Sequence, residues 1–510
     1  MKLTPRAYQL AIYHSILEKG NTLVVLPTGL GKTLLALMLI RDKVKEGRCL
    51  FVTPTKPLAK QHFESVKEIL DMNNEGEVAL VTGEHPPKKR KEMYESKVVI
   101  STPQTVRNDI QNGLIGTDFV LFIVDEAHRS IGDYAYVEVA QSLEKALIVG
   151  LTASPGGKRE RITEVMKNLK IQNIEIRTQS DDDVKEYVKK SNFTWIPIQL
   201  SPTLKLIKKQ LDDMITKHAH SLTSMGFPPP IKHKGQFLAM RERILNRPGN
   251  IKYAAIVQYT ILLNLLHMVE LIETQGVFAL RSYMEKVDEK TSKSAGMLRH
   301  EAGYKEVLEL CKTDEEHPKL KALVDLVKKL SGKKMIVFAQ YRDQIKLIER
   351  ELQKNDVRAR LFVGKRDKYT RKQQEETIQD FRDEKFDVLV SSSIAEEGLD
   401  IPAVDSVIFY EPIPSEIRTI QRRGRAARMK EGELYILMTR GTRDEYFYWS
   451  ARKKEAKMKT ILNSMQDSME IERKKNEIKK EVKKTEEKKG YEAKIPKTDA
   501  TGQTKMSEFV

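Results

Sequence analysis

The chain has 510 residues, too many for one hydrophobic core, and its length suggests about three domains. Lys and Arg number 89 against 72 Asp and Glu, and the net charge of +17 favours a polyanionic partner such as nucleic acid. Charge alone leaves open a protein that merely carries many surface lysines. Only Cys49 and Cys311 are present, which argues against a disulfide framework or a cysteine-ligated metal site and indicates a reducing cytosol.

The N-terminus MKLTPRAYQL has no hydrophobic signal core. We also expect charged residues to interrupt every apolar stretch before it reaches membrane-spanning length. These features predict a protein that stays in the cytoplasm and has no membrane partner.

Short apolar runs alternate with helical patterns from Asn21 to about Arg177. The runs TLVVL, CLFVT, KVVIST, FVLFIVDE and ALIVGLT are rich in Val, Ile and Leu and do not alternate with polar residues. Such runs are typical of strands buried on both faces of a parallel sheet. We therefore predict an α/β first domain over residues 1–195.

The pattern changes to long helical periodicity between about Pro202 and Glu316, where strand signals are missing. The Pro-rich stretch FPPP breaks any continuous helix. A plain linker would not need so many apolar positions at helical spacing. An all-helical insert is therefore expected over residues 196–316.

A second α/β series begins near Lys319, with the runs KMIVFAQ, RARLFVG, FDVLVSSS, SVIFYEP and ELYILM. These runs predict a second parallel sheet and, with a C-terminal helix, a domain over residues 317–466. Residues 467–510 are rich in Lys and Glu. We expect them to form a charged tail, either a solvated helix or disordered.

The stretch LPTGLGKT lies between a strand and a helix, the context that a phosphate-binding loop requires. Gly29 and Gly31 allow backbone N–H groups to turn toward phosphate oxygens, and the following helix adds its N-terminal dipole. Lys32 is expected to bind the β- and γ-phosphates of ATP, and Thr33 to bind Mg²⁺. Leu26 replaces the first glycine of the strict pattern. The predicted nucleotide-binding loop consists of Leu26, Pro27, Thr28, Gly29, Leu30, Gly31, Lys32 and Thr33.

The apolar strand in LFIVDEAH delivers two adjacent carboxylates at its carboxyl end. Asp125 is expected to hold Mg²⁺, and Glu126 to accept a proton from the attacking water. An acidic pair after a strand is often a helix cap instead. The phosphate-binding loop upstream favours the catalytic interpretation.

The basic stretch QRRGRAAR follows the second-domain strand SVIFYEP. Arg425 and Arg428 are three positions apart, so on a helix they point the same way and can reach a γ-phosphate held by the first domain. Taken alone, such a run is more often a solvated surface. Its pairing with the first domain favours a sensor that closes the cleft around ATP.

Together these stretches resemble superfamily 2 helicases. LPTGLGKT, DEAH, TASP, SIAEEGLDIP and QRRGRAAR occur in the order found there, over about Thr4 to Ser450. The resemblance implies two RecA-like domains that hydrolyse ATP between them. It also implies that RAYQ reads the adenine. The residues implied are Arg6 and Gln9 for adenine, Lys32, Asp125 and Glu126 for hydrolysis, Gln421, Arg425 and Arg428 for the γ-phosphate, and Gly398 and Asp400 for coupling.

Within the superfamily, DEAHRSIGDYAY, GLTASPG, YEPIPSEIRTIQRRGR and TRGTRDEYFYWS are similar to the archaeal Hef helicases and their relatives of the Fanconi anaemia group M type. In that family the helical insert resembles a polymerase thumb and grips branched DNA. Ala426 and Ala427 stand where Thr-Gly is commoner, which leaves the arginines in place. The stretch IERKKNE imitates part of the family's nuclease signature, but the Asp that should follow is missing. We therefore expect a helicase without the nuclease domain.

The stretches TPTKPLAKQH, TPQT and FAQYRD look like the nucleic-acid-facing motifs of these helicases. Both domains are expected to contact phosphates, with main-chain N–H groups and small hydroxyls more important than base edges. The insert adds the basic residues Lys232, Lys234, Arg241 and Arg243, so binding should depend strongly on salt. The predicted contact residues are Lys56, Gln61, Thr102, Gln104 and Arg107 in the first domain and Arg342, Lys365 and Ser392 in the second.

The last residues, QTKMSEFV, are similar to the sliding-clamp-binding peptide, Gln-x-x-aliphatic-x-x-aromatic followed by an aromatic or apolar residue. One helical turn places Met506 and Phe509 on a single face that can fill a hydrophobic pocket. A random tail ending is the alternative. The predicted clamp-binding residues are Gln503, Met506, Phe509 and Val510, tethered through the charged tail.

The sequence thus predicts an ATP-dependent DNA helicase or translocase that acts on forked or branched DNA and on single-stranded DNA in replication-fork repair or restart. ATP and Mg²⁺ are the expected cofactors. The expected partners are the sliding clamp and a separate structure-specific nuclease, at the nucleoid. Two alternatives remain. One is an RNA-sensing or RNA-remodelling ATPase, against which the clamp-like tail argues; the other is a branched-DNA clamp that uses ATP as a switch, against which Glu126 argues.

Overall fold

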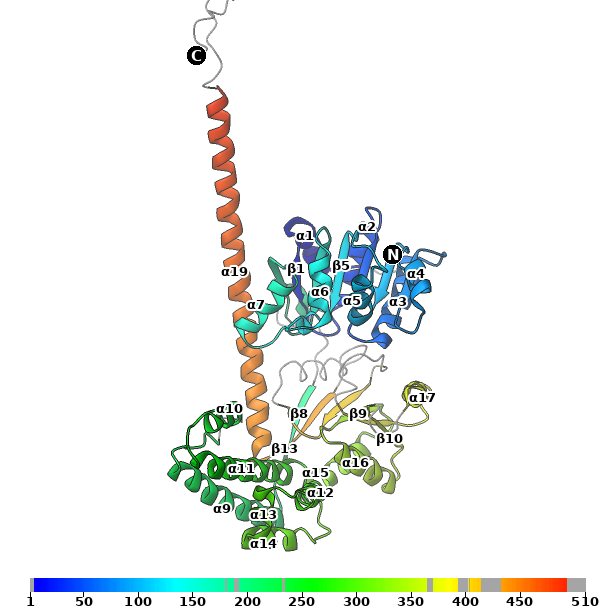
Figure 1. Ribbon diagram of the computed structural model, residues 1–510. Helices are drawn as coiled ribbons and strands as arrows, with labels where there is room; N and C mark the ends of the chain where they lie inside the picture. Colours follow the sequence, from blue (N-terminus) through cyan, green and yellow to red (C-terminus); the bar gives the residue numbers. More distant parts are fainter. Residues whose placement is uncertain are drawn as a thin grey trace, which may run out of the picture.

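The computed structural model of the chain describes residues 4–178, 181–187, 192–231, 234–364, 370–392, 402, 404–413 and 433–492. Within these ranges, the side chains of 192, 234, 371 and 476–492 are not described. The chain forms two α/β domains, a helical insert and one long C-terminal helix that runs past both domains (Figure 1).

The first domain is built on a seven-stranded parallel sheet with the order β3-β4-β2-β5-β6-β1-β7. Side chains along the central strands alternate between two apolar cores, one on each face of the sheet, which explains the unbroken apolar runs. The strands are β1 (Thr22–Val25), β2 (Cys49–Val52), β3 (Val78–Val81), β4 (Val98–Ser101), β5 (Leu121–Asp125), β6 (Leu147–Thr152) and β7 (Asn173–Ile176). The helices are α1 (Ala7–Lys19), α2 (Lys32–Lys43), α3 (Lys56–Leu70), α4 (Pro87–Met93), α5 (Pro103–Gln111), the 3₁₀ helix η1 (Ala127–Arg129), α6 (Ala135–Ser142), α7 (Arg159–Asn168) and α8 (Asp182–Lys185).

The second domain is built on a six-stranded parallel sheet with the order β10-β11-β9-β12-β13-β8. Its two faces also pack into separate apolar cores. The elements are β8 (Asn192–Ile198), α15 (Pro318–Lys329), β9 (Met335–Phe338), α16 (Arg342–Lys354), β10 (Ala359–Phe362), α17 (Arg371–Arg382), β11 (Val388–Ser391), β12 (Ser406–Phe409) and β13 (Glu433–Thr439).

The strand β8 corrects the expected boundary between the first domain and the insert. It pairs in parallel with β13 from Asn192 opposite Glu433 to Ile198 opposite Thr439, so it belongs to the second sheet. A division after residue 195 cuts through this strand. The second domain is therefore made of two pieces of chain, and the insert lies between them.

The insert is a bundle of six described helices around one apolar core. Ser201 begins the first helix by accepting a hydrogen bond from Leu204 N, and the Pro-rich stretch separates that helix from the second, as expected. The helices are α9 (Pro202–Ser224), α10 (Lys234–Leu245), α11 (Ile251–Thr274), α12 (Val277–Asp288), α13 (Lys293–His300) and α14 (Ala302–Leu310).

The helix α11 contradicts the expectation that charge interrupts every long apolar stretch. Among the described residues it is the one helix long and apolar enough to cross a membrane by length and composition. However, 61% of the relevant window is buried inside the protein, where α11 packs against α9, α10, α12 and α13. The central helix of a bundle meets the same criterion, so this finding is weak evidence for a membrane span.

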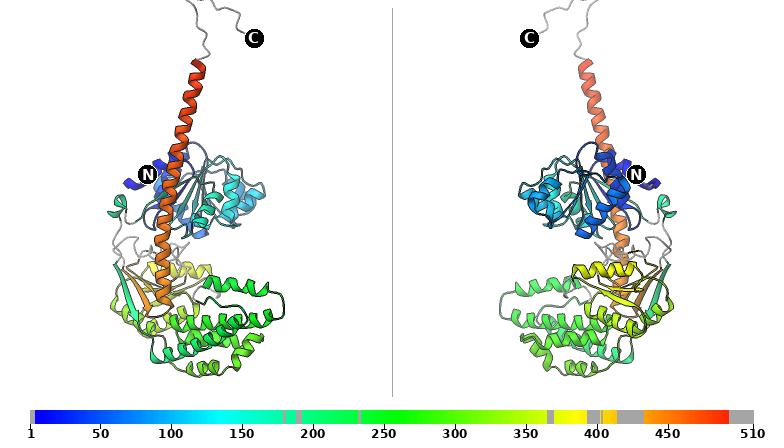
Figure 2. Two further views of the ribbon diagram at one scale, coloured as in Figure 1. Left: turned by 90° about the vertical axis from the view of Figure 1, so that its left-hand side faces the viewer. Right: turned by 90° about the vertical axis from the view of Figure 1, so that its right-hand side faces the viewer.

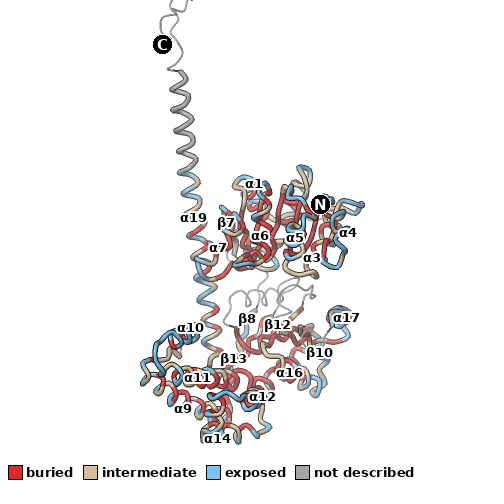
Figure 3. The backbone as a smooth tube through the Cα atoms, in the orientation of Figure 1, coloured by how far each residue is buried: buried red, intermediate tan, exposed pale blue. Residues whose placement is uncertain are grey.

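The C-terminal helix α19 (Arg443–Glu492) is continuous past residue 467. From that residue on, the sequence was compatible with either a solvated helix or disorder. The expected boundary between 466 and 467 therefore falls inside one helix. Figure 2 shows α19 beside the second domain at its start and beside the first domain further along, and its contacts with β13 and then β7 agree. Figure 3 shows buried positions on α19 beside the two domains.

Two ionic contacts at the start of α19 lie where the insert meets the second domain. Arg443 Nη1 lies 3.4 Å from Glu270 Oε2 of α11. The neighbouring Asp444 is completely buried, with Oδ2 2.5 Å from Nζ of the equally buried Lys319 on α15. Removing one partner of such a pair typically costs about 3–5 kcal/mol. Lys319 Nζ also donates to Thr274 O of α11 at 3.3 Å, so this pair too holds the insert against the second domain.

Candidate functional site

The phosphate-binding loop joins β1 to α2. Leu26 N donates to Thr152 O at 3.0 Å, which fixes the start of the loop to the end of β6. Gly29 and Gly31 have φ values of 88° and 77°, a left-handed conformation that favours glycine. Lys32, the first residue of α2, donates from Nζ to Leu26 O at 2.9 Å and so lies across the loop.

The RAYQ segment at the start of α1 is hydrogen-bonded to this loop. Tyr8 Oη and Gln9 Nε2 both donate to Leu30 O, at 2.7 and 3.1 Å. A Cβ at Gly31 would lie 2.3 Å from Gln9 Nε2, so only glycine allows this close approach. Gln9 Oε1 also accepts from Arg6 N at 2.9 Å. Sequence reasoning missed Tyr8, although an aromatic residue next to the expected adenine contact was a signal; its burial raises the pKa of the hydroxyl.

The two acidic residues follow the fully buried strand β5. Asp125 is 8% exposed, and its Oδ2 lies 3.3 Å from His62 Nε2. Glu126 has a φ of 49°, a strained conformation for a residue with a side chain. The structure thus turns Glu126 out of the strand, where its Oε2 lies 3.3 Å from His128 Nδ1.

The charges around Glu126 favour its ionised form. Burial raises the pKa of this carboxyl, but His128 and the charges of Lys32 and Arg129 outweigh burial and lower it. His128 Nδ1 lies 3.3 Å from Glu126 Oε2. The phosphate-binding loop and the acidic pair follow strands that only β6 separates, which places Lys32 near enough to lower the pKa of Glu126.

A chain of polar contacts links the acidic pair to the TASP stretch. His128 Nδ1 lies 3.2 Å from Thr152 Oγ1, which also accepts from Ser154 N at 3.1 Å. Behind β5, Tyr136 Oη donates to Asp125 O at 2.7 Å. The sequence offered TASP only as part of a family pattern, so the direct contacts of His128 and Thr152 were not foreseen.

The residues present fit ATP and Mg²⁺. The loop from Leu26 to Gly31 ends at a helix N-terminus, and the side chain of Lys32 supplies positive charge beside it. Thr33 is half-buried and Asp125 is buried, and both carry side-chain oxygen atoms of the kind that Mg²⁺ prefers as ligands. Glu126, whose Oε2 lies 3.3 Å from His128 Nδ1, supplies a carboxylate that can accept from a water molecule. Bound Mg²⁺ would neutralise phosphate charge here.

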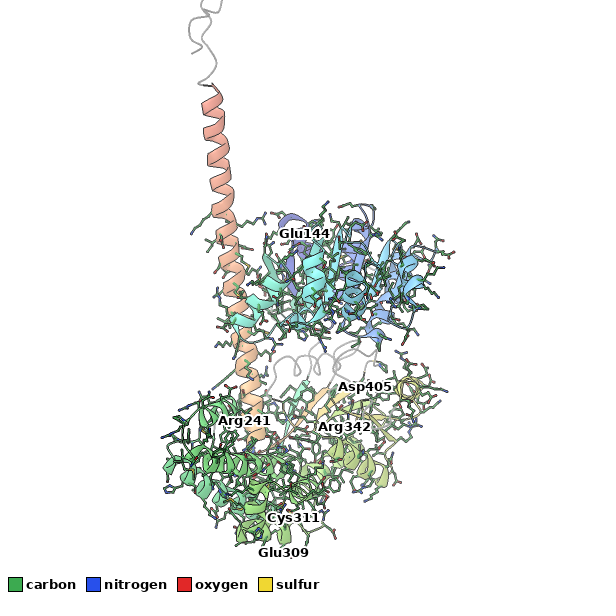
Figure 4. The ribbon with its side chains drawn as sticks, viewed as in Figure 1. Glu144, Arg241, Glu309, Cys311, Arg342 and Asp405 are labelled. Atoms are coloured by element: carbon green, nitrogen blue, oxygen red, sulfur yellow. The ribbon has the colours of Figure 1, made fainter. Side chains whose placement is uncertain are left out.

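The expected nucleic-acid contacts lie mostly where parallel strands end. Lys56 begins α3 after β2, and Thr102 lies between β4 and α5. In the second domain, Arg342 begins α16 after β9, and Ser392 follows β11. Strand carboxyl ends share one edge of each sheet, so these positions form two rows, one on each domain. Figure 4 shows Arg342 on the second domain and Arg241 in the insert.

These side chains differ in how available they are. Gln104 is exposed, whereas Thr102 is 6% exposed and its hydroxyl lies 3.0 Å from that of Thr105. Lys56 Nζ pairs with Glu84 at 2.9 Å, and Arg107 Nη1 lies 3.6 Å from Glu138. The other candidate contact residues that the structure describes are half-buried, namely Gln61, Arg342 and Ser392.

Several predicted residues lie outside the part of the chain that the structure describes, and their roles stay predictions. They are Lys232, Lys365, Gly398, Asp400, Gln421, Arg425 and Arg428, together with the clamp-binding residues Gln503, Met506, Phe509 and Val510.

The structure contains two parallel sheets, and in the first sheet the phosphate-binding loop and the DEAH sequence both follow the carboxyl ends of strands. This combination defines the superfamily 2 helicase class. Three family models match the chain. Residues 2–157 match the type III restriction enzyme res subunit, and residues 318–430 match the helicase conserved C-terminal domain. Residues 203–329 match the helical bundle of a putative ATP-dependent RNA helicase.

The chain is similar to the crystal structure of the Pyrococcus furiosus Hef helicase domain, with 37% identity and a TM-score of 0.67. The match covers 88% of this chain and 98% of that one. This chain is also 40% identical to a putative ATP-dependent RNA helicase of Methanocaldococcus jannaschii, in a match that covers 91% of this chain and 61% of the relative. It is 32% identical to the ATP-dependent DNA helicase fml1 of Schizosaccharomyces pombe, covering 86% and 57%.

The chain belongs to the family of Hef and Fanconi anaemia group M helicases within superfamily 2. It spans less than two thirds of the length of these curated relatives, 61% of the Methanocaldococcus protein and 57% of the Schizosaccharomyces protein.

Proposed function

We propose that this protein is an ATP-dependent DNA helicase or translocase that acts on forked or branched DNA. The observation that carries the proposal is the shared site of Lys32 and Glu126, a phosphate-binding lysine and an ionised carboxylate held at one edge of a buried sheet. DNA is favoured because a Hef helicase domain and named DNA helicases are among the similar proteins. The net charge of +17 suits a nucleic-acid backbone.

In this proposal the chain's own residues divide the work of hydrolysis. Backbone N–H groups from Gly29 to Thr33 and the charge of Lys32 bind the phosphates, and Gln9 lies on the adenine side. Glu126 orients a water and accepts its proton, which the lowered pKa of this carboxyl permits at neutral pH. Arg425 and Arg428 are proposed to approach the γ-phosphate from the second domain.

The tail and the partners belong to the same proposal. Gln503, Met506, Phe509 and Val510 are proposed to bind a sliding clamp, which would raise the local concentration of the enzyme at replicating DNA. A separate structure-specific nuclease and a place at the nucleoid in the cytoplasm are proposed with it. Loss of clamp binding in Phe509→Ala would support the tether, and unchanged binding would contradict it.

RNA is a second candidate track, favoured by one observation. The Methanocaldococcus relative at 40% identity and the family model that matches the insert are both named for RNA helicases. An RNA-remodelling ATPase would use the same nucleotide site, so the site itself does not separate the two tracks.

The experiment is to measure ATPase rates with forked DNA, linear duplex DNA and structured RNA of matched length at one salt concentration. Forked DNA should stimulate most, and strand displacement on the fork should require hydrolysis. Stimulation mainly by RNA would overturn the DNA assignment. Turnover without strand movement would favour a branched-DNA clamp that uses ATP as a switch.

The control for this experiment is Lys32→Ala. Full stimulated turnover in that variant would contradict the ATPase site itself, whichever nucleic acid stimulates best.

A further inference from the structure

An apolar stripe on α19 is part of the core of the first domain. Met458, Leu462 and Met465 are 7%, 0% and 4% exposed and belong to the apolar core on one face of the first sheet, with Ile461 and Met469 at its edge. The helix contacts this sheet at β7. The buried positions recur at intervals of four and three, one face of a helix. A helix that starts on the second domain therefore docks on the first domain further along its length (Figure 2).

Polar contacts flank this stripe. Lys459 Nζ donates to Thr178 Oγ1 at 3.1 Å, and Glu470 Oε1 lies 3.4 Å from Lys19 Nζ. Contacts at such partly exposed positions add little stability by themselves. The apolar stripe accordingly provides most of the docking energy, and the polar contacts fix its register.

The first residue of the stripe touches the catalytic motifs directly. Ser154 Oγ donates to Met458 Sδ at 3.0 Å in a buried contact. Ser154 N in turn donates to Thr152 Oγ1, which contacts His128 beside Glu126. The polar chain that begins at the catalytic carboxylate therefore ends on α19.

The other end of α19 is anchored on the body that is expected to hold branched DNA. Arg443 contacts Glu270 of the insert, and the buried Asp444 contacts Lys319 of the second domain. A continuous helix transmits displacement along its axis because its backbone hydrogen bonds resist stretching. Movement of the insert relative to the first domain must then either shift Met458 on Ser154 or bend α19.

We propose that Met458 is a positioning residue that couples the arrangement of the insert and second domain to the TASP stretch and hence to Glu126. The proposal rests on the ATPase function proposed above and assigns its regulation to α19. Docked α19 holds Ser154 and Thr152 where His128 can contact both Thr152 and Glu126. Undocking of Met458 releases Ser154 and lowers turnover without changing the nucleotide-binding loop.

The test compares Met458→Ala with Met465→Ala in the full chain. Both variants remove a buried methionine from the same helix and core, but Met458 alone of the two contacts Ser154. We expect Met458→Ala to lower nucleic-acid-stimulated kcat about three- to tenfold, the range set by one buried hydrogen bond, with KM for ATP unchanged. Both variants should lower the Tm by a similar amount. Met465→Ala should nevertheless keep wild-type kcat.

A double-mutant cycle checks the contact itself. Met458→Leu keeps the buried volume and removes the sulfur, and Ser154→Ala removes the hydroxyl. If the two groups act through each other, the double variant should lose no more kcat than the more impaired single variant. Losses that multiply would overturn the proposed contact, as would equal kcat in Met458→Ala and Met465→Ala.

Wild-type turnover tests the proposed ATPase separately. Should the wild type hydrolyse ATP while the two alanine variants behave alike, the positioning role alone fails. Amide hydrogen exchange at residues 152–154 gives a readout that needs no turnover. It should be faster in Met458→Ala than in Met465→Ala, and equal exchange would contradict the role of Met458.

Discussion

The two sheets of the molecule use one scaffold for different purposes. Strands β2 to β6 of the first sheet and β9 to β13 of the second follow the same spatial order, and β8 stands where β1 stands. The crossover after β1 carries the phosphate-binding loop, whereas the crossover after β8 carries the whole helical insert. A single position in this topology therefore holds either the nucleotide site or the accessory domain.

The carboxylates at equivalent strand ends show the same division. Glu126 follows β5 with a φ of 49°, and its carboxylate lies beside His128 and under the influence of the Lys32 charge. Glu411 follows β12, is completely buried and accepts a hydrogen bond from Gln340 N after β9. In the proposed function the first domain uses its strand-end acid for chemistry, whereas in the second domain the equivalent acid closes a loop.

The largest expected effect comes from exchanging these acids for uncharged residues. Glu126→Gln should lower kcat for ATP about 10²- to 10⁴-fold, the contribution of a general base, with little change in Tm. Glu411→Ala should instead destabilise the protein by about 1–3 kcal/mol, because Gln340 N loses its acceptor, and should keep kcat per folded molecule. Steady-state kinetics and thermal unfolding of both variants measure this. A stability loss in Glu126→Gln equal to that in Glu411→Ala would break the comparison.

A smaller effect is expected when the pH is lowered. It is a loss of folding stability caused by a buried histidine at the start of the second piece of the second domain. His317 is 1% exposed, accepts from Lys319 N at Nδ1, and contacts Glu273 O through Nε2. Burial and then the charge of Lys319 lower its pKa to about 3. The unfolded chain binds a proton below pH 6.5 that the folded chain does not, so stability falls as the pH drops. From pH 6.5 to 5 this costs about 2 kcal/mol.

Urea unfolding at both pH values measures this loss. His317→Asn removes the titrating group, so its unfolding free energy should change less over the same interval. An equally steep loss in that variant would assign the pH dependence to other groups.

The smallest effect tests the equivalence of the two sheets. Ser101 Oγ donates to Val81 O at 2.7 Å, and Ser391 Oγ donates to Phe362 O at 2.9 Å, each buried at the same strand end of its sheet. Ser101→Ala and Ser391→Ala should each cost about 1 kcal/mol by urea unfolding. Thr102→Ala and Ser392→Ala, on the neighbouring residues, are the controls. A loss confined to one sheet would show that the equivalence is topological only.

The sequence predicted the elements with strong local signals. The apolar runs identified β1, β2, β4, β5 and β6, and the loop and acidic pair lie where their spacing placed them. The strand β8 was missed because Thr194 and Pro197 interrupt its apolar pattern, and its partner β13 is far away in the chain. The docking of α19 was missed because lysines surround its stripe and hide the spacing of Met458, Leu462 and Met465. Side-chain contacts such as Gln9 with Leu30 depend on three-dimensional approach that no local pattern encodes.

The pairing of β8 with β13 also has a consequence for biosynthesis. A ribosome releases Asn192 long before it releases Glu433, so β8 must wait for its partner while the insert is made. The insert closes through contacts within its own stretch of chain, which form faster than contacts between distant segments. Once folded, the insert brings β8 and α15, which flank it in the chain, close together. The effective length of chain between β8 and its partner β13 is then shorter. Completion of the second sheet is therefore expected to be the slow step of folding, and the nascent chain needs protection until β13 has emerged.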